Sequence, residues 1–164
     1  RHCATVEEAL KSGVFLEPTN YVIADRKKIA YVEVLPDGTH ASRVYDRGRF
    51  AHTNHYLMPE HQAANVKIGE SSRIRYERIT TLMDEQAKPY SMEDFIAWTK
   101  DRHDGPDNSI ERSGKSSSTT LSAMVVHIPP EGDPEIYLRW RENPAVEDMS
   151  IAKEARSIFV PPVR

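Results

Sequence analysis

The chain has 164 residues, of which 29% are charged and 38% apolar, and its formal net charge is −3. This length suits one domain over residues 1–164, and the interspersed charges argue against nucleic-acid binding and against a polybasic membrane surface. No apolar run approaches the roughly 20 residues that cross a bilayer. The single cysteine excludes an internal disulfide and favours a reducing compartment such as the cytoplasm.

The first predicted element is a helix over residues 5–12, because Thr5-Val6-Glu7-Glu8 has the spacing of a capping box and Gly13 is a stop signal. Arg1-His2-Cys3 leads into this helix with no initiator Met. We therefore expect the chain to be a fragment or a processed product, the C-terminal portion of a larger domain.

Four short runs rich in strand formers follow, separated by turn-forming residues. These predicted strands are Tyr21–Ala24, Ile29–Leu35, Ala41–Tyr45 and Phe50–Thr53. Pro36-Asp37-Gly38 is a strong turn signal between the second and third. The first half thus predicts a short helix followed by an antiparallel meander.

The second half predicts two helices and then a hairpin. A helix over Ser72–Gln86 has an apolar face, and a second helix opens at Ser91 and runs to Arg102. Residues 104–118 are rich in Gly, Ser, Asp and Asn, which favours a loop. The remaining predicted elements are strands over 119–128 and 135–141, a helical turn near 151–156 and an extended segment over 157–160.

The order of these elements defines the expected fold class. Runs of strands and runs of helices, without strict βαβ alternation, predict an α+β fold with helices packed on an antiparallel sheet. The chain offers few elements to cover such a sheet, so we expect further covering partners outside it.

Two polar residues in the middle of the chain are the first functional candidates. Asn54 follows the last predicted strand of the meander. Arg75 precedes Ile79 and Leu82 by four and seven residues, offsets that share one helical face. A charge in line with an apolar stripe is costly unless it is paired or has a function. We therefore predict functional roles for Asn54 and Arg75.

Structural roles are the alternatives for both candidates. Asn54 can cap a turn after the strand, since Asn is a common turn residue. Arg75 can form an ion pair, and Glu33 and Asp25 are the candidate partners.

Several short motifs, in this order and spacing, resemble the linear-amide hydrolases of the N-terminal-nucleophile (Ntn) superfamily. The closest groups are the acyl-CoA:6-aminopenicillanic-acid acyltransferases and, more distantly, the choloylglycine hydrolases and penicillin V acylases. The resemblance covers residues 1–128 and is carried by the segments 3–9, 20–25, 30–34 and 53–56 and by the S-S-x-x-R-Y pattern of residues 71–76.

The resemblance implies a four-layer αββα sandwich and an N-terminal cysteine exposed by autocatalytic cleavage. The thiol of that cysteine is the nucleophile and its α-amine is the base. Asn54, in the T-N motif, is implied to form part of the oxyanion hole, where one amide donor can contribute about 3 kcal/mol. Arg75 is implied to lie close to the nucleophile, where a fixed cation favours the thiolate. No cofactor and no metal are expected.

Cys3 does not match the nucleophile, because the resemblance places the T-V-E-E-A segment well after the catalytic cysteine. We expect Cys3 to be a small buried residue before the first helix. The nucleophile is then expected upstream of Arg1, and this chain alone is expected to be inactive.

Other residues that could carry chemistry have structural interpretations. His52, His55 and His61 argue weakly for a metal site, because positions 52 and 55 of a strand point to opposite faces and no cysteine joins them. Ser71 and Ser72 are expected to be helix caps.

Two later motifs also favour structure over function. Gly114-Lys115-Ser116 lacks the earlier glycine of a phosphate-binding loop and follows no strand, so we expect a solvated loop. Phe95 and Trp98 lie at helical spacing and are expected in the core.

Two functions remain open at this point. The first is an Ntn amide hydrolase or acyltransferase, represented by its C-terminal portion and acting on a small-molecule amide or acyl substrate. Its expected partner is the upstream part of the same polypeptide or a companion chain, and a homo-oligomer is compatible with it. The second is a non-catalytic α+β binding or structural module that keeps the Ntn scaffold.

Overall fold

The computed structural model describes residues 3–13, 15, 17–86, 88–114, 119–141 and 152–154. The chain divides into two compact units, the first ending at Gly69 and the second beginning at Glu70. Each unit has its own three-stranded antiparallel sheet and its own helices. The predicted α+β class is confirmed. The four-layer arrangement and the single domain over 1–164 stay predictions.

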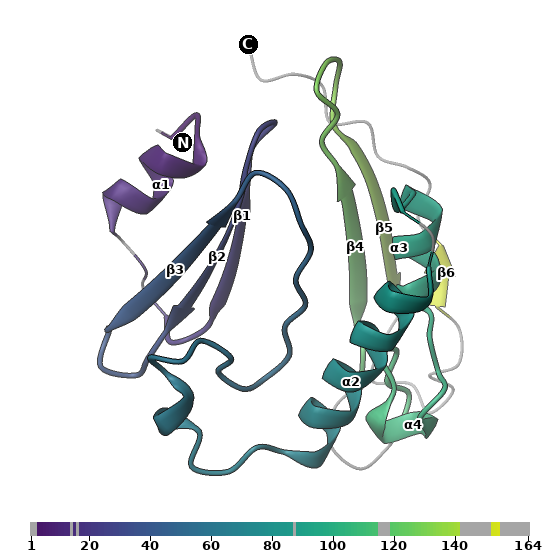
Figure 1. Cartoon of the computed structure of the whole chain (residues 1–164). Coiled ribbons are helices and arrows are strands. Elements are labelled where there is room, and N and C mark those ends of the chain that lie inside the picture. Colours follow the sequence, from purple (N-terminus) through teal and green to yellow (C-terminus); the bar gives the residue numbers. More distant parts are fainter. Residues whose placement is uncertain are drawn as a thin grey trace. The chain divides into compact units, whose positions relative to one another are not determined.

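The first unit is a helix followed by an antiparallel meander (Figure 1). Its strands are β1 (Asn20–Ala24), β2 (Ile29–Val34) and β3 (His40–Tyr45), with β2 in the centre. Helix α1 (Val6–Ser12) precedes them, and a short 3-10 turn, η1 (Gln62–Ala64), follows. Three of the four predicted strands are thereby confirmed.

Helix α1 begins and ends where the sequence predicts. The side chain of Thr5 accepts a hydrogen bond of 3.2 Å from the backbone N–H of Glu8. Gly13 adopts the left-handed conformation with φ of 63°, and its N–H reaches the carbonyl of Leu10. The carboxylate of Asp25, in the β1–β2 turn, accepts from the N–H of Val6 at 2.8 Å, which joins the helix start to the sheet.

Strand β2 forms the core of the first unit. Its last five residues are all buried, and Ala30, Val32 and Glu33 have no exposed surface. Because side chains alternate along a strand, Tyr31 and Glu33 lie on one face, while Ala30, Val32 and Val34 lie on the other. Both faces of β2 are therefore covered.

The predicted strand over Phe50–Thr53 is wrong. Residues 46–69 are irregular apart from turns and η1. The rings of Phe50 and His52 lie 5.2 Å and 5.0 Å from the ring of Tyr31, measured between centroids. These strand-forming residues thus do not pair with another strand but cover one face of β2 with their side chains. Figure 1 shows α1 and this segment on different sides of the three strands.

The second unit consists of helices α2 (Glu70–Glu85), α3 (Met92–Thr99) and α4 (Gly105–Asn108) and the strands β4 (Ser122–His127), β5 (Glu135–Arg141) and β6 (Ala152–Glu154). The strands pair in the order β4-β5-β6. Helix α4 packs against α2, and α3 packs against β4. The two long predicted helices and the hairpin are confirmed, with ends shifted by a few residues.

Two local predictions for the second unit are wrong. The loop predicted over 104–118 contains the four-residue helix α4. The polar composition of this segment gave no sign of a helix. The helical turn predicted near 151–156 is strand β6 over residues 152–154, because this short segment pairs with the exposed edge of β5. The extended segment predicted over 157–160 lies outside the described residues.

Buried ion pairs fix the loop after α3 to the sheet. Glu111 and Arg139 are 2% and 5% exposed, and the guanidinium of Arg139 pairs with the carboxylate of Glu111. The same guanidinium donates to the carbonyl of Thr99 at 2.8 Å, and Arg102 donates to Glu111 at 2.8 Å. The pKa of Glu111 is lowered, because these two guanidinium groups outweigh the effect of burial.

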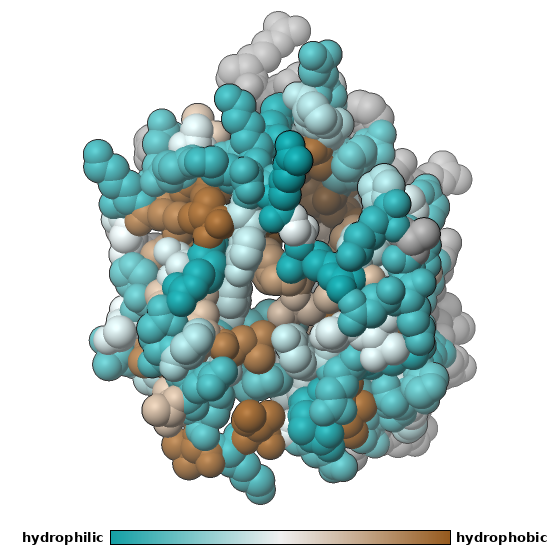
Figure 2. Space-filling view, viewed as in Figure 1, coloured by the Kyte–Doolittle hydropathy of each residue, from teal (hydrophilic) through white to brown (hydrophobic). Residues whose placement is uncertain are grey.

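One face of the hairpin β4–β5 carries apolar side chains that the described helices leave exposed. Val125 is buried on the α3 side, whereas Met124 and Val126 on the opposite face are 64% and 43% exposed. The register places Trp140 of β5 on that same face, where it is 41% exposed. The space-filling view shows apolar patches on an otherwise mainly hydrophilic surface (Figure 2). No helix in the described part of the chain is both long and apolar enough for a membrane span.

Candidate functional site

Asn54 is an exposed residue at a bend in the irregular segment that follows β3. Its neighbour Thr53 is held at two points: the carbonyl accepts from the side-chain amide of Asn20 at 3.4 Å, and the hydroxyl lies 3.2 Å from Nδ1 of His55. The side-chain amide of an asparagine carries neutral N–H donors, which is the kind of group that binds an oxyanion.

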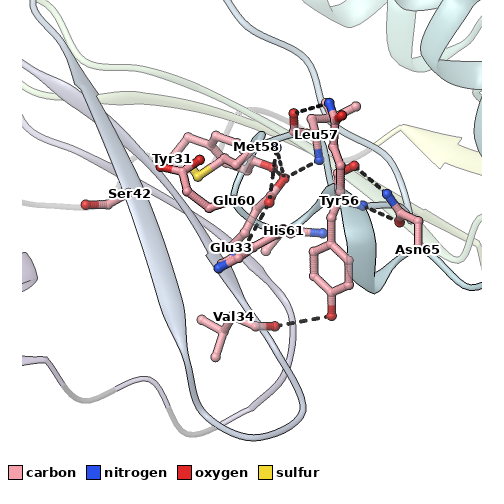
Figure 3. A network of polar contacts seen from close by, with 12 residues as sticks. Tyr31, Glu33, Val34, Ser42, Tyr56, Leu57, Met58, Glu60, His61 and Asn65 are labelled. Atoms are coloured by element: carbon pink, nitrogen blue, oxygen red, sulfur yellow. Dashed lines mark hydrogen bonds and ion pairs between the residues drawn. The ribbon is translucent and has the colours of Figure 1, made fainter.

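The segment around Asn54 is anchored to one buried carboxylate. Glu33 of β2 accepts hydrogen bonds from the backbone N–H of Leu57, at 2.6 Å, and of Met58, at 3.2 Å to each carboxylate oxygen. The hydroxyl of Tyr31 also donates to Oε1 of Glu33. Figure 3 shows Glu33 pointing from its strand toward Leu57 and Met58. A group with no exposed surface thus holds the loop by its backbone.

Two histidines complete the surroundings of Glu33. Nε2 of His52 lies within hydrogen-bond distance of Oε1, at 3.3 Å, and its side chain is 8% exposed. Nδ1 of His61 lies 3.3 Å from Oε2, but not in hydrogen-bond geometry. His52, which carried only a weak argument for a metal, instead contributes to a carboxylate anchor.

The protonation states in this cluster follow from burial and hydrogen bonding. Burial acts to raise the pKa of Glu33, but the donors Tyr31, Leu57 and Met58 together outweigh it, so the pKa is lowered and the carboxylate is ionised at neutral pH. Burial lowers the pKa of His52 despite the nearby carboxylate. The neutral ring of His52 must therefore carry its proton on Nε2 to donate to Glu33.

A second clamp lies just beyond Asn54. The side-chain amide of Asn65 makes two hydrogen bonds with the backbone of Tyr56: Oδ1 accepts from its N–H at 2.9 Å, and Nδ2 donates to its carbonyl at 2.8 Å. The hydroxyl of Tyr56 lies 3.4 Å from the carbonyl of Val34 (Figure 3). Together these contacts hold the segment on the C-terminal side of the bend.

Arg75 lies in the second turn of α2, in the second unit, and is half-buried. Its Nε donates to the carbonyl of Ser71 at 3.1 Å and approaches the hydroxyl of Ser71 at 3.4 Å. That hydroxyl donates to the carbonyl of Asp107 at 3.0 Å, which joins α2 to α4. Burial and the charge of Arg112 lower the pKa of Arg75, which stays protonated at neutral pH because a guanidinium is so strongly basic.

The structure gives Asp25 and Cys3 local surroundings within the first unit. Asp25 accepts from the N–H of Lys27 and Lys28 at 2.7 and 2.9 Å, and so caps its turn. Cys3 is exposed, so the expectation that it is buried is wrong; it lies before the start of α1, which leaves its side chain outside the core. Among the residues that the structure describes, no group of three His, Cys, Asp or Glu side chains is arranged to hold a metal.

The helix-bound candidates are partly as predicted. Ser71 and Ser72 lie inside the first turn of α2, which begins at Glu70, and Ser72 is buried. Trp98 is 7% exposed and belongs to the core as predicted. Phe95 is 44% exposed, so its expected core position is wrong, although its ring forms an edge contact with Trp98 at 4.9 Å between centroids. Gly114 is buried, which contradicts the expected solvated loop at this residue.

Sequence reasoning missed Glu33 as the anchor of the loop and considered it only as a partner for Arg75. One signal was present: an acidic residue in the middle of an otherwise apolar strand, Ile29–Val34. A carboxylate at such a position requires several donors. The sequence did not reveal that backbone N–H groups of residues 57 and 58 would supply them.

The α+β fold and the order of the T-N and S-S-x-x-R motifs indicate an Ntn-hydrolase-like protein. The family model described as acyl-coenzyme A:6-aminopenicillanic acid acyl-transferase matches residues 1–143. The chain therefore belongs to this family, and the resemblance seen in the sequence is confirmed. Membership indicates acyltransferase or hydrolase activity in general. Comparison with curated proteins finds no match to this chain.

Proposed function

We propose that this chain supplies the oxyanion-binding part of an enzyme that cleaves linear amide bonds or transfers their acyl group. Its nucleophile is an N-terminal cysteine upstream of Arg1, freed by autoprocessing, on the same polypeptide or on a companion chain. The observation that carries the proposal is the exposed Asn54 on a bend whose two sides are tied to the buried Glu33.

The proposed chemistry assigns one role to each residue. The cysteine thiolate attacks the amide carbon, a C–S bond forms, and the carbonyl oxygen gains negative charge that the side-chain amide of Asn54 binds. The tetrahedral intermediate collapses as the C–N bond breaks, and the leaving amine takes a proton from the α-ammonium of the cysteine. Water or a second amine then attacks the thioester carbon and gives a proton to the α-amine of the cysteine. The C–S bond breaks, the thiolate leaves, and hydrolysis or acyl transfer is complete. Arg75 supplies a fixed positive charge that favours the thiolate.

The exposed apolar face of the hairpin β4–β5 supports the same proposal. Met124, Val126 and Trp140 are exposed on this face of the described strands. In a four-layer αββα sandwich, such a face packs against another sheet.

Replacing Asn54 tests the proposal. In the full gene product, Asn54→Ala is expected to reduce kcat for a small N-acyl amide about 10²-fold or more, because one oxyanion donor is lost. Circular dichroism and thermal melting should show an unchanged fold, since Asn54 is exposed. Gln86→Ala is the matched control, because it removes an exposed amide just beyond α2. Wild-type turnover in Asn54→Ala would remove Asn54 from the site.

One observation favours the alternative, a binding module without catalysis. An open pocket of about 380 Å³ lies between the start of α3 and the hairpin, with Tyr90, Phe95, Val125 and His127 among its lining residues. Aromatic and apolar walls with several titratable side chains at the same pocket suit a small ligand. The absence of any turnover in the full gene product, together with saturable ligand binding that Val125→Trp abolishes, would favour this function.

A further inference from the structure

We propose that Glu33 is a positioning residue for Asn54: its carboxylate holds both sides of the bend and so fixes where the amide of Asn54 can point. This inference rests on the proposed function, because it assigns Asn54 to the oxyanion hole. Glu33 itself has no exposed surface and touches no substrate.

The first step is the geometry of the anchor. Glu33 reaches His52, two residues before Asn54, at 3.3 Å. It also reaches the N–H of Leu57, three residues after Asn54, at 2.6 Å, and that of Met58 at 3.2 Å. One carboxylate thus binds the chain before and after the bend. Only four residues, 53–56, lie between the anchored residues His52 and Leu57, so the course of the bend is narrowly fixed.

The second step is the rigidity of the support. Glu33 lies on β2, the central strand, which pairs with β1 and β3 along its length. Its partner in the sheet register is Asn20, whose amide reaches the carbonyl of Thr53 at 3.4 Å. Two neighbouring strands therefore contact the bend directly. A catalytic donor needs a support of this kind, because a displacement of half an ångström already weakens its hydrogen bond to the transition state.

The third step concerns what a change at Glu33 would do. In Glu33→Gln, an amide NH₂ replaces one of the acceptor oxygens, while Leu57, Met58, Tyr31 and His52 all still present donors. Oε1 accepts from all four of these groups, whereas Oε2 accepts only from Met58, so the NH₂ at the second position removes one contact of Met58. The donors at Oε1 then meet a neutral oxygen in place of a charged one, which weakens their hydrogen bonds. The anchor on both sides of the bend is loosened with little change in side-chain volume.

The experiment compares kcat and KM in the full gene product for four variants: Asn54→Ala, Glu33→Gln, the double variant and Glu60→Gln. Glu60 is the matched control, because it lies in the same segment but is exposed and pairs with Arg43 on the surface. Glu33→Gln is expected to lower kcat about 10- to 100-fold with little change in KM. The double variant should be no slower than Asn54→Ala, and Glu60→Gln should behave as wild type.

The possible results separate the two proposals. If Asn54→Ala is slow but folded Glu33→Gln turns over normally, or if their effects multiply in the double variant, the positioning role is wrong and the proposed function stands. If Asn54→Ala turns over normally, both are wrong. Should Glu33→Gln fail to fold, His52→Phe decides, because it keeps the ring on Tyr31 and removes only the anchor before the bend. A wild-type kcat in His52→Phe would then overturn the positioning role.

Discussion

At the scale of single residues, Glu33 is the group with the largest expected effect on the stability of the first unit. It is a buried, ionised carboxylate that satisfies four donors from a strand, a histidine and a loop. Buried charges are tolerated only with such partners, and each lost partner of a buried charged group costs about 1–3 kcal/mol or more. The stability of the first unit should therefore respond to the protonation of this cluster.

We expect the free energy of unfolding to fall in two steps as the pH is lowered. Burial lowers the pKa of His52 in the folded protein below the ordinary histidine pKa of about 6.5. As the pH falls below about 6.5, His52 therefore takes up a proton more readily in the unfolded chain than in the folded protein, and the free energy of unfolding decreases. The pKa of Glu33 is also lowered in the folded state, so its contribution is present above the unfolded pKa of about 4.3 and is lost as the pH falls through the folded value. Both groups thus destabilise the protein toward acid.

Urea unfolding of the wild type and of His52→Phe at intervals from pH 7.5 to pH 4 measures these steps. The variant should lack the loss of stability that begins near pH 6.5, at about the ordinary histidine pKa. It should keep the loss at lower pH. Identical pH profiles for the two proteins would contradict the assignment to His52.

The sequence was enough to select candidate residues, whose roles stay predictions, but not to describe their surroundings. Asn54 and Arg75 could be selected because the T-N and S-S-x-x-R motifs are local and resemble a family. The anchoring of Leu57 and Met58 by Glu33 spans 24 and 25 residues and uses backbone N–H groups, which leave no trace in side-chain patterns. Cys3 was expected to be buried from the average behaviour of free cysteine, whereas its position before α1 leaves it exposed.

At the scale of elements, caps and turns were the most predictable features. Thr5 and Gly13 delimit α1, and Ser91 opens α3 with a capping box to Asp94, because these signals act within a few residues. Elements decided by tertiary contacts were missed. Phe50 and His52 alternate like a strand but pack on Tyr31, and β6 exists because β5 offers a free edge.

The short helix α4 packs tightly against the loop that follows it. A substitution at Gly114 tests this packing. A Cβ built on Gly114 would lie 1.8 Å from Oδ1 of Asp107 in α4, and the N–H of Gly114 donates to the carbonyl of Pro106 at 2.9 Å. We expect Gly114→Ala to lower the free energy of unfolding by about 1–3 kcal/mol, the usual cost of overpacking.

Gly69→Ala is the matched control for this prediction, because a Cβ there meets nothing within 4 Å and the backbone is not left-handed. Urea unfolding monitored by tryptophan fluorescence compares the two variants. Equal stabilities would show that the side chain of Asp107 moves aside at little cost.

At the scale of the whole molecule, the chain is a pair of compact units, each with an antiparallel sheet and helices. The family match over residues 1–143 covers the whole first unit and most of the second. The order of predicted elements was enough for the α+β class, because runs of strands and of helices are visible in the sequence. The exposure of Met124 and Trp140 was not predictable, because no local pattern shows which face of a strand is left uncovered.

The central claim is that this chain assists a cysteine nucleophile that lies before Arg1. The most direct measurement is mass spectrometry of the full gene product after acid quenching of its reaction with an N-acyl amide. We predict an acyl thioester on the N-terminal cysteine of a peptide that precedes Arg1, with less adduct formed in Asn54→Ala in the first turnover. An adduct on Cys3, or the absence of any acylated cysteine during measurable turnover, would contradict the account.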